Sequence, residues 1–68
     1  MNILVNGKSE AVEGGSTVKS VLDAKDLDPA LVSVEHNGKI LEKSDLGGAV
    51  LAEGDELEIL FFMGGGRD

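Results

Sequence analysis

Two Asn-Gly dipeptides, Asn6-Gly7 and Asn37-Gly38, constrain the fold of this chain more than any other feature. Both central residues of a type I′ turn need a positive φ angle, which asparagine and glycine adopt more readily than other residues. Short runs of strand-forming residues flank each dipeptide, so the sequence predicts two antiparallel hairpins. The expected strands are residues 2–5 and 8–13 in the first hairpin and residues 31–35 and 40–41 in the second.

One short helix is predicted between the two hairpins. The Thr17 hydroxyl can accept a hydrogen bond from the free amides at a helix start. The helix should end near residues 25–26, because Pro29 and the residue before it both disfavour helical continuation. The inward face of this helix consists of apolar residues at i, i+3 and i+4 spacing, namely Val18, Val21 and Leu22.

The second half of the chain ends in a strand that alternates between two kinds of side chain. Before it, Ser44-Asp45 can form a single helical turn, residues 49–51 can be a short extended piece, and residues 53–55 form a tight turn. From Glu56 onward, strict alternation predicts a strand with two different faces. One face carries Leu57, Ile59 and Phe61, and the other carries Glu56, Glu58, Leu60 and Phe62.

One sheet with one helix across it is the simplest arrangement of these elements. With the first and last strands adjacent at its centre, the helix would cover Ile3, Val5, Leu57, Ile59 and Phe61. The opposite, outer face of the sheet would then expose Leu4, Leu60 and Phe62 near the end of the chain. A contiguous exposed apolar patch on a small protein usually marks a contact surface, so we expect a partner to dock there.

Length and composition exclude several classes of protein. A chain of 68 residues accommodates one domain, expected over residues 1–63, followed by a flexible glycine tail at 64–68. Without cysteine there is neither a disulfide nor a thiolate metal site. The longest apolar run is far shorter than the about 20 residues needed to span a bilayer, and the N-terminus lacks a secretory signal, so a cytoplasmic location is expected. The net charge of -7 disfavours nucleic acid and anionic lipid, and favours a basic protein partner.

The sequence offers no self-contained catalytic site. His36 is the single histidine and has no recognisable nucleophile motif beside it. The carboxylates of residues 53–58 do not match the spacing of a calcium loop, and are interpreted as a solvated acidic face. In that face Glu56 and Glu58 are candidates for steering a basic partner. The three glycines at 64–66 lack the lysine and the helix of a phosphate-binding loop.

Five stretches together resemble a known family. They are residues 1–7, Thr17-Val18 with Val21-Leu22, residues 34–38, residues 53–57, and the glycine pair Gly65-Gly66. In this order and length they resemble the ubiquitin-like β-grasp fold, and more closely the ThiS family of bacterial sulfur carriers for thiamine biosynthesis. The resemblance covers the whole chain and implies an α+β fold with a mixed sheet of four to five strands and one helix packed across it.

The resemblance also implies a mechanism centred on the terminal glycines. In that family an E1-like, ThiF-like enzyme uses ATP and Mg²⁺ to adenylate the C-terminal glycine. A sulfur donor with a cysteine persulfide then displaces AMP, and the resulting thiocarboxylate delivers sulfur to a thiazole synthase of the ThiG type. Such a carrier is a monomeric protein co-substrate that is not itself an enzyme and binds no cofactor. Carried over to this chain, Gly66 is the acyl carrier, Gly64 and Gly65 are the narrow recognition segment, and Leu4, Leu60, Phe62, Glu56 and Glu58 form the docking surface.

The two residues after Gly66 depart from the family pattern. Arg67 and Asp68 leave the chain without a glycine carboxylate, so we expect a protease to remove them. Three alternatives remain open at this point. They are the small subunit of molybdopterin synthase, a sulfur carrier for methionine or homocysteine synthesis, and a β-grasp module that binds its partner without covalent chemistry.

Overall fold

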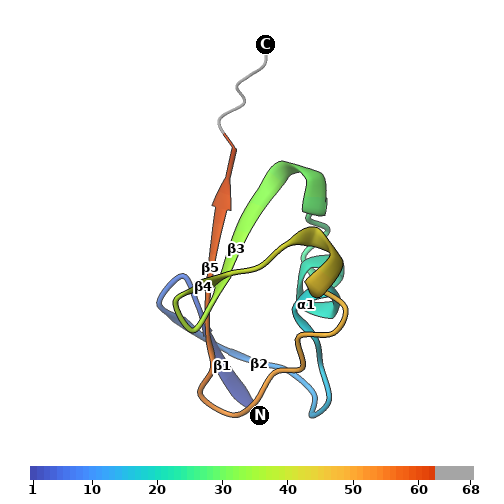
Figure 1. Cartoon of the computed structure of the whole chain (residues 1–68). Coiled ribbons are helices and arrows are strands. Elements are labelled where there is room, and N and C mark those ends of the chain that lie inside the picture. Colours follow the sequence, from blue (N-terminus) through green and yellow to red (C-terminus); the bar gives the residue numbers. More distant parts are fainter. Residues whose placement is uncertain (63–68) are drawn as a thin grey trace.

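The computed structural model describes residues 1–62 and shows a five-stranded sheet with one α-helix packed on one face (Figure 1). The strand order is β2-β1-β5-β3-β4, in which β1 and β5 are parallel and the other neighbours are antiparallel. The predicted mixed sheet with the first and last strands at its centre is therefore confirmed. The elements are β1 (Asn2–Val5), β2 (Lys8–Ala11), α1 (Val18–Ala24), the 3-10 turn η1 (Pro29–Leu31), β3 (Val32–His36), β4 (Lys39–Ile40), the 3-10 turn η2 (Lys43–Asp45) and β5 (Glu56–Phe61).

Both Asn-Gly dipeptides form the predicted turns. Asn6 and Gly7 have φ angles of 51° and 84°, and Asn37 and Gly38 have 52° and 85°, as a type I′ turn requires. The strands around them are slightly different from those expected. β2 stops at Ala11, two residues early, and β4 begins one residue before the predicted position. The expected boundary after residue 63 and the tail at 64–68 lie outside the described residues.

Both ends of α1 are capped by local hydrogen bonds. At the N-terminus, the predicted cap Thr17 accepts from the Ser20 amide at 3.1 Å, and the Ser20 hydroxyl accepts from the Thr17 amide at 2.9 Å. At the C-terminus, the Leu27 amide donates to the Leu22 carbonyl and the Asp26 amide donates to the Asp23 carbonyl. This pair of bonds is a Schellman motif, and it places Asp26 in the left-handed region with φ 63°.

The core is entirely apolar among the described residues. It combines the predicted inner residues of β1, β5 and α1 with residues from β3 and from the connection between β4 and β5. The buried members are Ile3, Val5, Val18, Val21, Leu22, Val32, Val34, Leu46, Leu51, Leu57 and Ile59. Leu46 and Leu51 were absent from the predicted core, since irregular segments such as η2 have no hydrophobic period that would indicate which side chain points inward. Within residues 1–62, no helix is long and apolar enough to cross a membrane.

Phe61 is the one predicted core residue that the structure contradicts. Its side chain is on the inner face of β5, as the alternation predicted, but 59% of its surface is exposed. α1 spans only seven residues, so it covers β5 as far as Ile59 and not beyond. Alternation identifies the face of a strand, whereas burial also depends on how far the covering helix extends.

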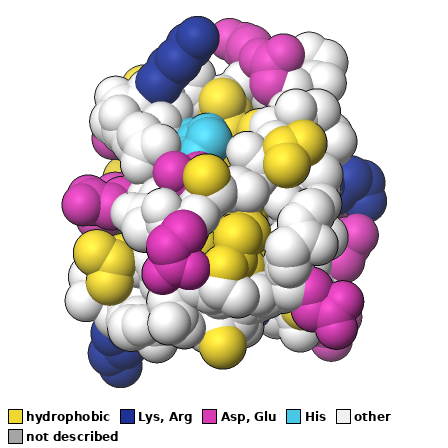
Figure 2. Space-filling model, turned by 90° about the horizontal axis from the view of Figure 1, so that it is seen from below, with side chains coloured by type: hydrophobic (Ala, Val, Ile, Leu, Met, Phe, Trp, Pro, Cys, Tyr) yellow, Lys and Arg dark blue, Asp and Glu magenta, His cyan; other side chains and the backbone are white. Residues whose placement is uncertain are grey.

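A hydrogen-bonded pair joins the start of β5 to the β3–β4 hairpin. His36 Nε2 lies 2.8 Å from Asp55 Oδ2, and the Asp55 carboxylate also accepts from the Ala52 amide and the Asn37 side-chain amide. Because an ionised carboxylate only accepts, the hydrogen is on His36 Nε2. Figure 2 shows this end of the molecule, with the histidine beside an acidic side chain. The pair stabilises the fold, because it holds the β3–β4 turn against the start of β5.

The Asp55 carboxyl is more acidic than usual. Its pKa is lowered from the usual 3.8, chiefly by the hydrogen bond from His36, then by those from the Ala52 backbone and the Asn37 side chain, while burial acts weakly in the opposite direction. A carboxyl whose pKa is lower in the folded chain stabilises the fold while it is ionised. This stabilisation is therefore present above the unfolded pKa and disappears as the pH falls through the folded pKa.

The left-handed conformation of Asp26 predicts opposite effects for two substitutions. Asp26→Gly should raise the free energy of unfolding by about 0.5 to 1 kcal/mol, because glycine adopts this conformation without a Cβ penalty. Asp26→Ala should lower it by a similar amount, about 0.5 to 1 kcal/mol, since alanine disfavours positive φ. Both variants remove the same charge, so urea denaturation of the pair separates the backbone effect from electrostatics. Equal shifts in the same direction would show that charge dominates.

The Asp55 network predicts an acid-sensitive contribution to stability. At pH 6, Asp55→Asn should lower the free energy of unfolding by about 1 kcal/mol, since it weakens hydrogen bonds to a charged acceptor. The difference from the wild type should shrink as the pH falls below the unfolded pKa of 3.8 and through the lower folded pKa, where the wild-type carboxylate becomes protonated. Urea denaturation across this range measures it, and His36→Leu should reduce the same pH dependence. If the wild type and Asp55→Asn lost stability in parallel, Asp55 would not be the responsible group.

Candidate functional site

The candidate site lies where the chain leaves β5, at the end of the molecule away from the N-terminus (Figure 1). β5 is the central strand, with β1 parallel to it on one side and β3 antiparallel on the other. The predicted acyl carrier Gly66 and the recognition residues Gly64 and Gly65 lie outside the described residues. What the structure describes is the base from which they extend.

Asn6 anchors β5 three residues before the end of the described chain. Its Oδ1 accepts from the Ile59 amide at 2.7 Å, and its Nδ2 donates to the Ile59 carbonyl at 3.2 Å. The side chain thus continues the β1–β5 ladder after the β1 backbone has turned away. On the other side of β5, the Phe62 amide donates to the Leu31 carbonyl at 3.0 Å. The backbone before the glycines is consequently held from both sides.

Asn6 was predicted only as a turn residue. Its second role depends on which strand lies beside β1 and in which register, and the side chains flanking Asn6 in the sequence do not indicate either. The register places Val5 beside Leu57, so that Asn6 reaches Ile59. Asparagine suits this position because its amide offers both a donor and an acceptor, as a peptide group does.

The predicted docking residues all lie on the outer side of the sheet, but they do not form one continuous patch. Leu60 and Phe62 lie two residues apart at the end of β5, with 54% and 55% of their surfaces exposed. Leu4 is half-buried and pairs with Glu56 at the start of β5. Leu60 is four residues further along β5, which corresponds to about 13 Å of strand. The acidic residues Glu56 and Glu58 therefore separate it from Leu4. The apolar part of the predicted docking surface near the chain end is therefore Leu60 and Phe62.

The acidic part of this face is larger than predicted. Glu56 and Glu58 are exposed, as expected, and Glu35 of β3 lies directly opposite Glu58 in the register. Two like charges at directly opposed positions destabilise a sheet, unless a cation from elsewhere compensates them. Glu35 was missed because its partner strand is not evident from the sequence. We name Glu35, Glu56, Glu58, Leu60 and Phe62 the outer face.

The side chains of residues 1–62 do not form a metal centre. No cluster of three or more metal-ligating side chains occurs in this part of the chain. The one histidine binds Asp55 at the beginning of β5, at the opposite end of the strand from the site. The described site therefore consists of an anchored strand end beside an exposed apolar and acidic surface.

Two solved structures are similar to this chain over nearly its whole length. One is a crystal structure of the thiamine biosynthesis protein ThiS from Geobacter metallireducens, with 39% identity and a TM-score of 0.81, covering 97% of this chain and 100% of that one. The other is a solution structure of a thiamine biosynthesis protein from the same organism, with 39% identity and a TM-score of 0.77, covering 100% of this chain and 91% of that one. These matches establish the ubiquitin-like β-grasp fold.

Two curated relatives are much longer proteins. Thiazole synthase of Magnetococcus marinus is 34% identical over 98% of this chain, and thiazole synthase of Paramagnetospirillum magneticum is 35% identical over 100% of it. This chain spans 21% of the length of each relative. The model of the ThiS family matches residues 3–66, from the first strand to the third glycine. The chain belongs to the ThiS family.

Proposed function

We propose that this protein is a sulfur carrier for the thiazole step of thiamine biosynthesis, with Gly66 as its acyl carrier. The observation that supports this most directly is the family match, which continues through the glycines to residue 66. The names of the similar structures and of the longer relatives all belong to thiamine biosynthesis. They favour this pathway over molybdopterin, methionine or homocysteine synthesis. The cytoplasm remains the expected location.

The proposed chemistry begins at a free carboxylate of Gly66. With a pKa of about 3.5, an α-carboxylate is ionised at neutral pH and can attack the α-phosphate of ATP, releasing pyrophosphate. The E1-like enzyme supplies the ATP site, Mg²⁺ and the cations that offset the negative charge of both reactants. A persulfide on the sulfur donor then attacks the acyl carbon and AMP leaves. This forms a C–S bond and an acyl disulfide that keeps the S–S bond of the persulfide. A thiol then attacks the donor sulfur, forms a disulfide with it and releases the thiocarboxylate on Gly66.

The glycines suit this chemistry because they have no side chains and because three of them in extended conformation span a long distance. Glycine has no Cβ to crowd the acyl carbon, and three extended residues span about 10 Å at ~3.4 Å each. Residues 64–66 can therefore reach a nucleotide buried in a partner while the body of the carrier stays outside. The Asn6 and Leu31 contacts support this role, because they hold the base of the segment in one position on the carrier.

A thiazole synthase is the proposed acceptor of the sulfur. In the two relatives, a segment similar to this chain is part of a thiazole synthase, which places carrier and synthase sequences in one polypeptide. The same pairing between separate chains would bring the thiocarboxylate to the synthase by docking. The outer face is suited to such docking, since it combines apolar side chains with three carboxylates.

The proposal requires that the peptide bond after Gly66 be cut, because Arg67 follows it. A chain ending at Gly66 should form an acyl-adenylate with an E1-like enzyme and ATP, measured as carrier-dependent exchange of labelled pyrophosphate into ATP. The full-length chain should show no exchange until a protease is added. A chain ending at Gly65 is the matched control and should react at least about 10-fold more slowly, since misplacing the reacting group strongly reduces rates. Equal exchange with the full-length chain would contradict Gly66 as the acyl carrier.

Charge reversal on the outer face should slow association with a basic partner. We expect Glu56→Lys/Glu58→Lys to reduce the association rate constant about 10-fold at low salt, with a smaller effect at 0.5 M salt where charges are screened. Stopped-flow mixing with the E1-like enzyme measures this rate. Glu13→Lys/Glu42→Lys is the matched control, because it makes the same change in net charge at two exposed positions outside this face. Equal slowing by both double variants would attribute the effect to net charge alone.

A further inference from the structure

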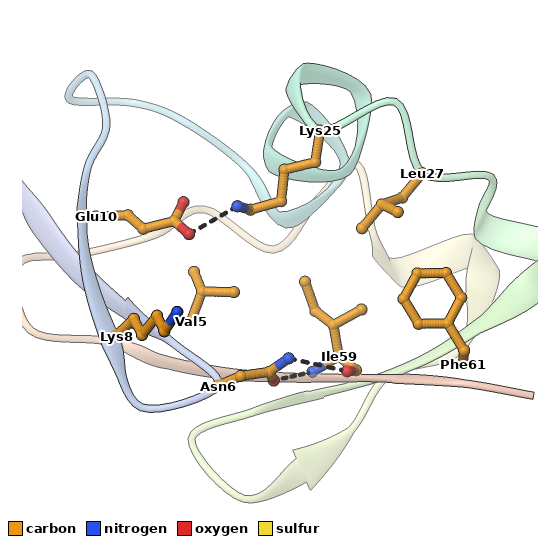
Figure 3. Close-up of a pocket in the computed structure, with 8 residues that line it drawn as sticks. All are labelled: Val5, Asn6, Lys8, Glu10, Lys25, Leu27, Ile59 and Phe61. Carbon is orange, nitrogen blue, oxygen red and sulfur yellow. Dashed lines mark hydrogen bonds and ion pairs between the residues drawn. The ribbon is translucent and has the colours of Figure 1, made fainter.

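A groove opens on the inner side of the sheet beside the last residues of β5 (Figure 3). It lies between the end of α1, strand β2 and β5, and has a volume of about 340 Å³. The outer face is on the other side of the sheet, so the two surfaces do not overlap. Its lining includes Val5, Lys8, Lys25, Leu27, Ile59 and Phe61.

The backbone of Phe61 is available for pairing on the groove side. Alternate residues of β5 direct their backbone groups towards β1, and the carbonyls of Asp55 and Leu57 and both backbone groups of Ile59 are bonded there. Phe61 continues this series, so its N–H and C=O point the same way. β1 has already ended at Val5, and no strand among residues 1–62 lies beside them. An unpaired strand edge of this kind is where an extended peptide can add to a sheet.

The groove has an apolar floor and an apolar wall. Val5 and Ile59 are buried at the floor, whereas Phe61 is largely exposed and Leu27 is half-buried. The Schellman motif at the end of α1 fixes the position of Leu27, and the Asn6 bonds fix Ile59. An exposed aromatic ring facing a fixed aliphatic side chain offers a preformed site for one large apolar side chain.

The groove also carries one unpaired positive charge, although the net charge of the chain is -7. Lys25 Nζ binds Glu10 at 2.7 Å, which neutralises that pair. Lys8 projects from β2 on the same face, and no carboxylate among residues 1–62 lies within ion-pair distance of it. One free cation beside an apolar site is complementary to one carboxylate next to an apolar side chain. The net charge of -7 disfavours a longer acidic run.

We propose that this groove binds an extended segment of a partner protein, in which a large apolar residue and an acidic residue are two positions apart. The segment adds to the free edge of β5 by backbone hydrogen bonds at Phe61. Side chains two positions apart lie on one side of a strand, so the apolar one packs between Leu27 and Phe61 while the carboxylate meets Lys8. This inference stands independently of the carrier chemistry, because it concerns a different face and uses none of the glycines.

The test uses the blocked peptide acetyl-Ser-Val-Leu-Val-Glu-Ser-amide and ¹⁵N-labelled full-length protein. Amide shifts should be largest for Lys8, Leu27 and Phe61 and small on the outer face. Phe61→Ala should weaken binding about 10-fold, as expected for loss of a central apolar contact. Two further peptides, one N-methylated at leucine and the other at the following valine, test the backbone pairing. Binding should be lost in the peptide whose methylated backbone nitrogen faces β5.

A charge swap makes the proposal falsifiable. Lys8→Glu should weaken binding of this peptide about 5-fold, and a peptide with lysine in place of glutamate should bind Lys8→Glu better than it binds the wild type. Lys39→Glu, with the same change in charge on β4, should leave both affinities close to those of the wild type. Circular dichroism confirms that each variant is folded.

Three outcomes would overturn the inference. The first is shifts concentrated on Glu58 and Leu60, which would place the peptide on the outer face. The second is the same groove shifts on raising the protein concentration without peptide, which would identify a second copy as the occupant. The third is markedly tighter peptide binding by a chain ending at Phe62, which would identify residues 63–68 of the chain itself as the occupant.

Discussion

The pairing of the first strand with the last is the interaction on which the rest of this structure depends. β1 and β5 are parallel neighbours at the centre of the sheet, and most of the buried side chains either belong to them or pack against them. Their ladder is short, and the Asn6 side chain lengthens it by imitating one more peptide group. The same pairing holds the strand from which the glycines extend. Core stability and the placement of the end of β5 are thus provided by one set of contacts.

Most of the fold could be predicted from local patterns in the sequence. The Asn-Gly turns, the Thr17 cap and the alternation in β5 each depend on residues close together in the chain, and each was confirmed. Errors arose where the outcome depends on distant elements. Phe61 is exposed because α1 ends too early to cover it, and no property of residues near Phe61 indicates the length of α1.

The same distinction applies to the candidate site. The exposure of Glu56, Glu58, Leu60 and Phe62 follows from the alternation of one strand and could be predicted. Glu35 opposite Glu58, Leu4 away from Leu60, and Asn6 bonded to Ile59 all depend on strand register. Register is determined by how two strands meet, so it follows from the fold as a whole rather than from either strand alone. The two surfaces on either side of β5 also differ in charge, which becomes apparent only when β2 and α1 are placed beside it.

The Asn6–Ile59 contact joins positions 53 residues apart in a chain of 68. Closing a loop of this length costs more conformational entropy than forming either hairpin, and contacts of high sequence separation slow folding. The anchor for the glycine segment therefore exists only after synthesis has reached β5 and the two ends of the domain have met. An incomplete or unfolded chain can form the two hairpins, but it cannot form the contact between Asn6 and Ile59. The fold thereby restricts this contact with β5 to molecules that have finished folding.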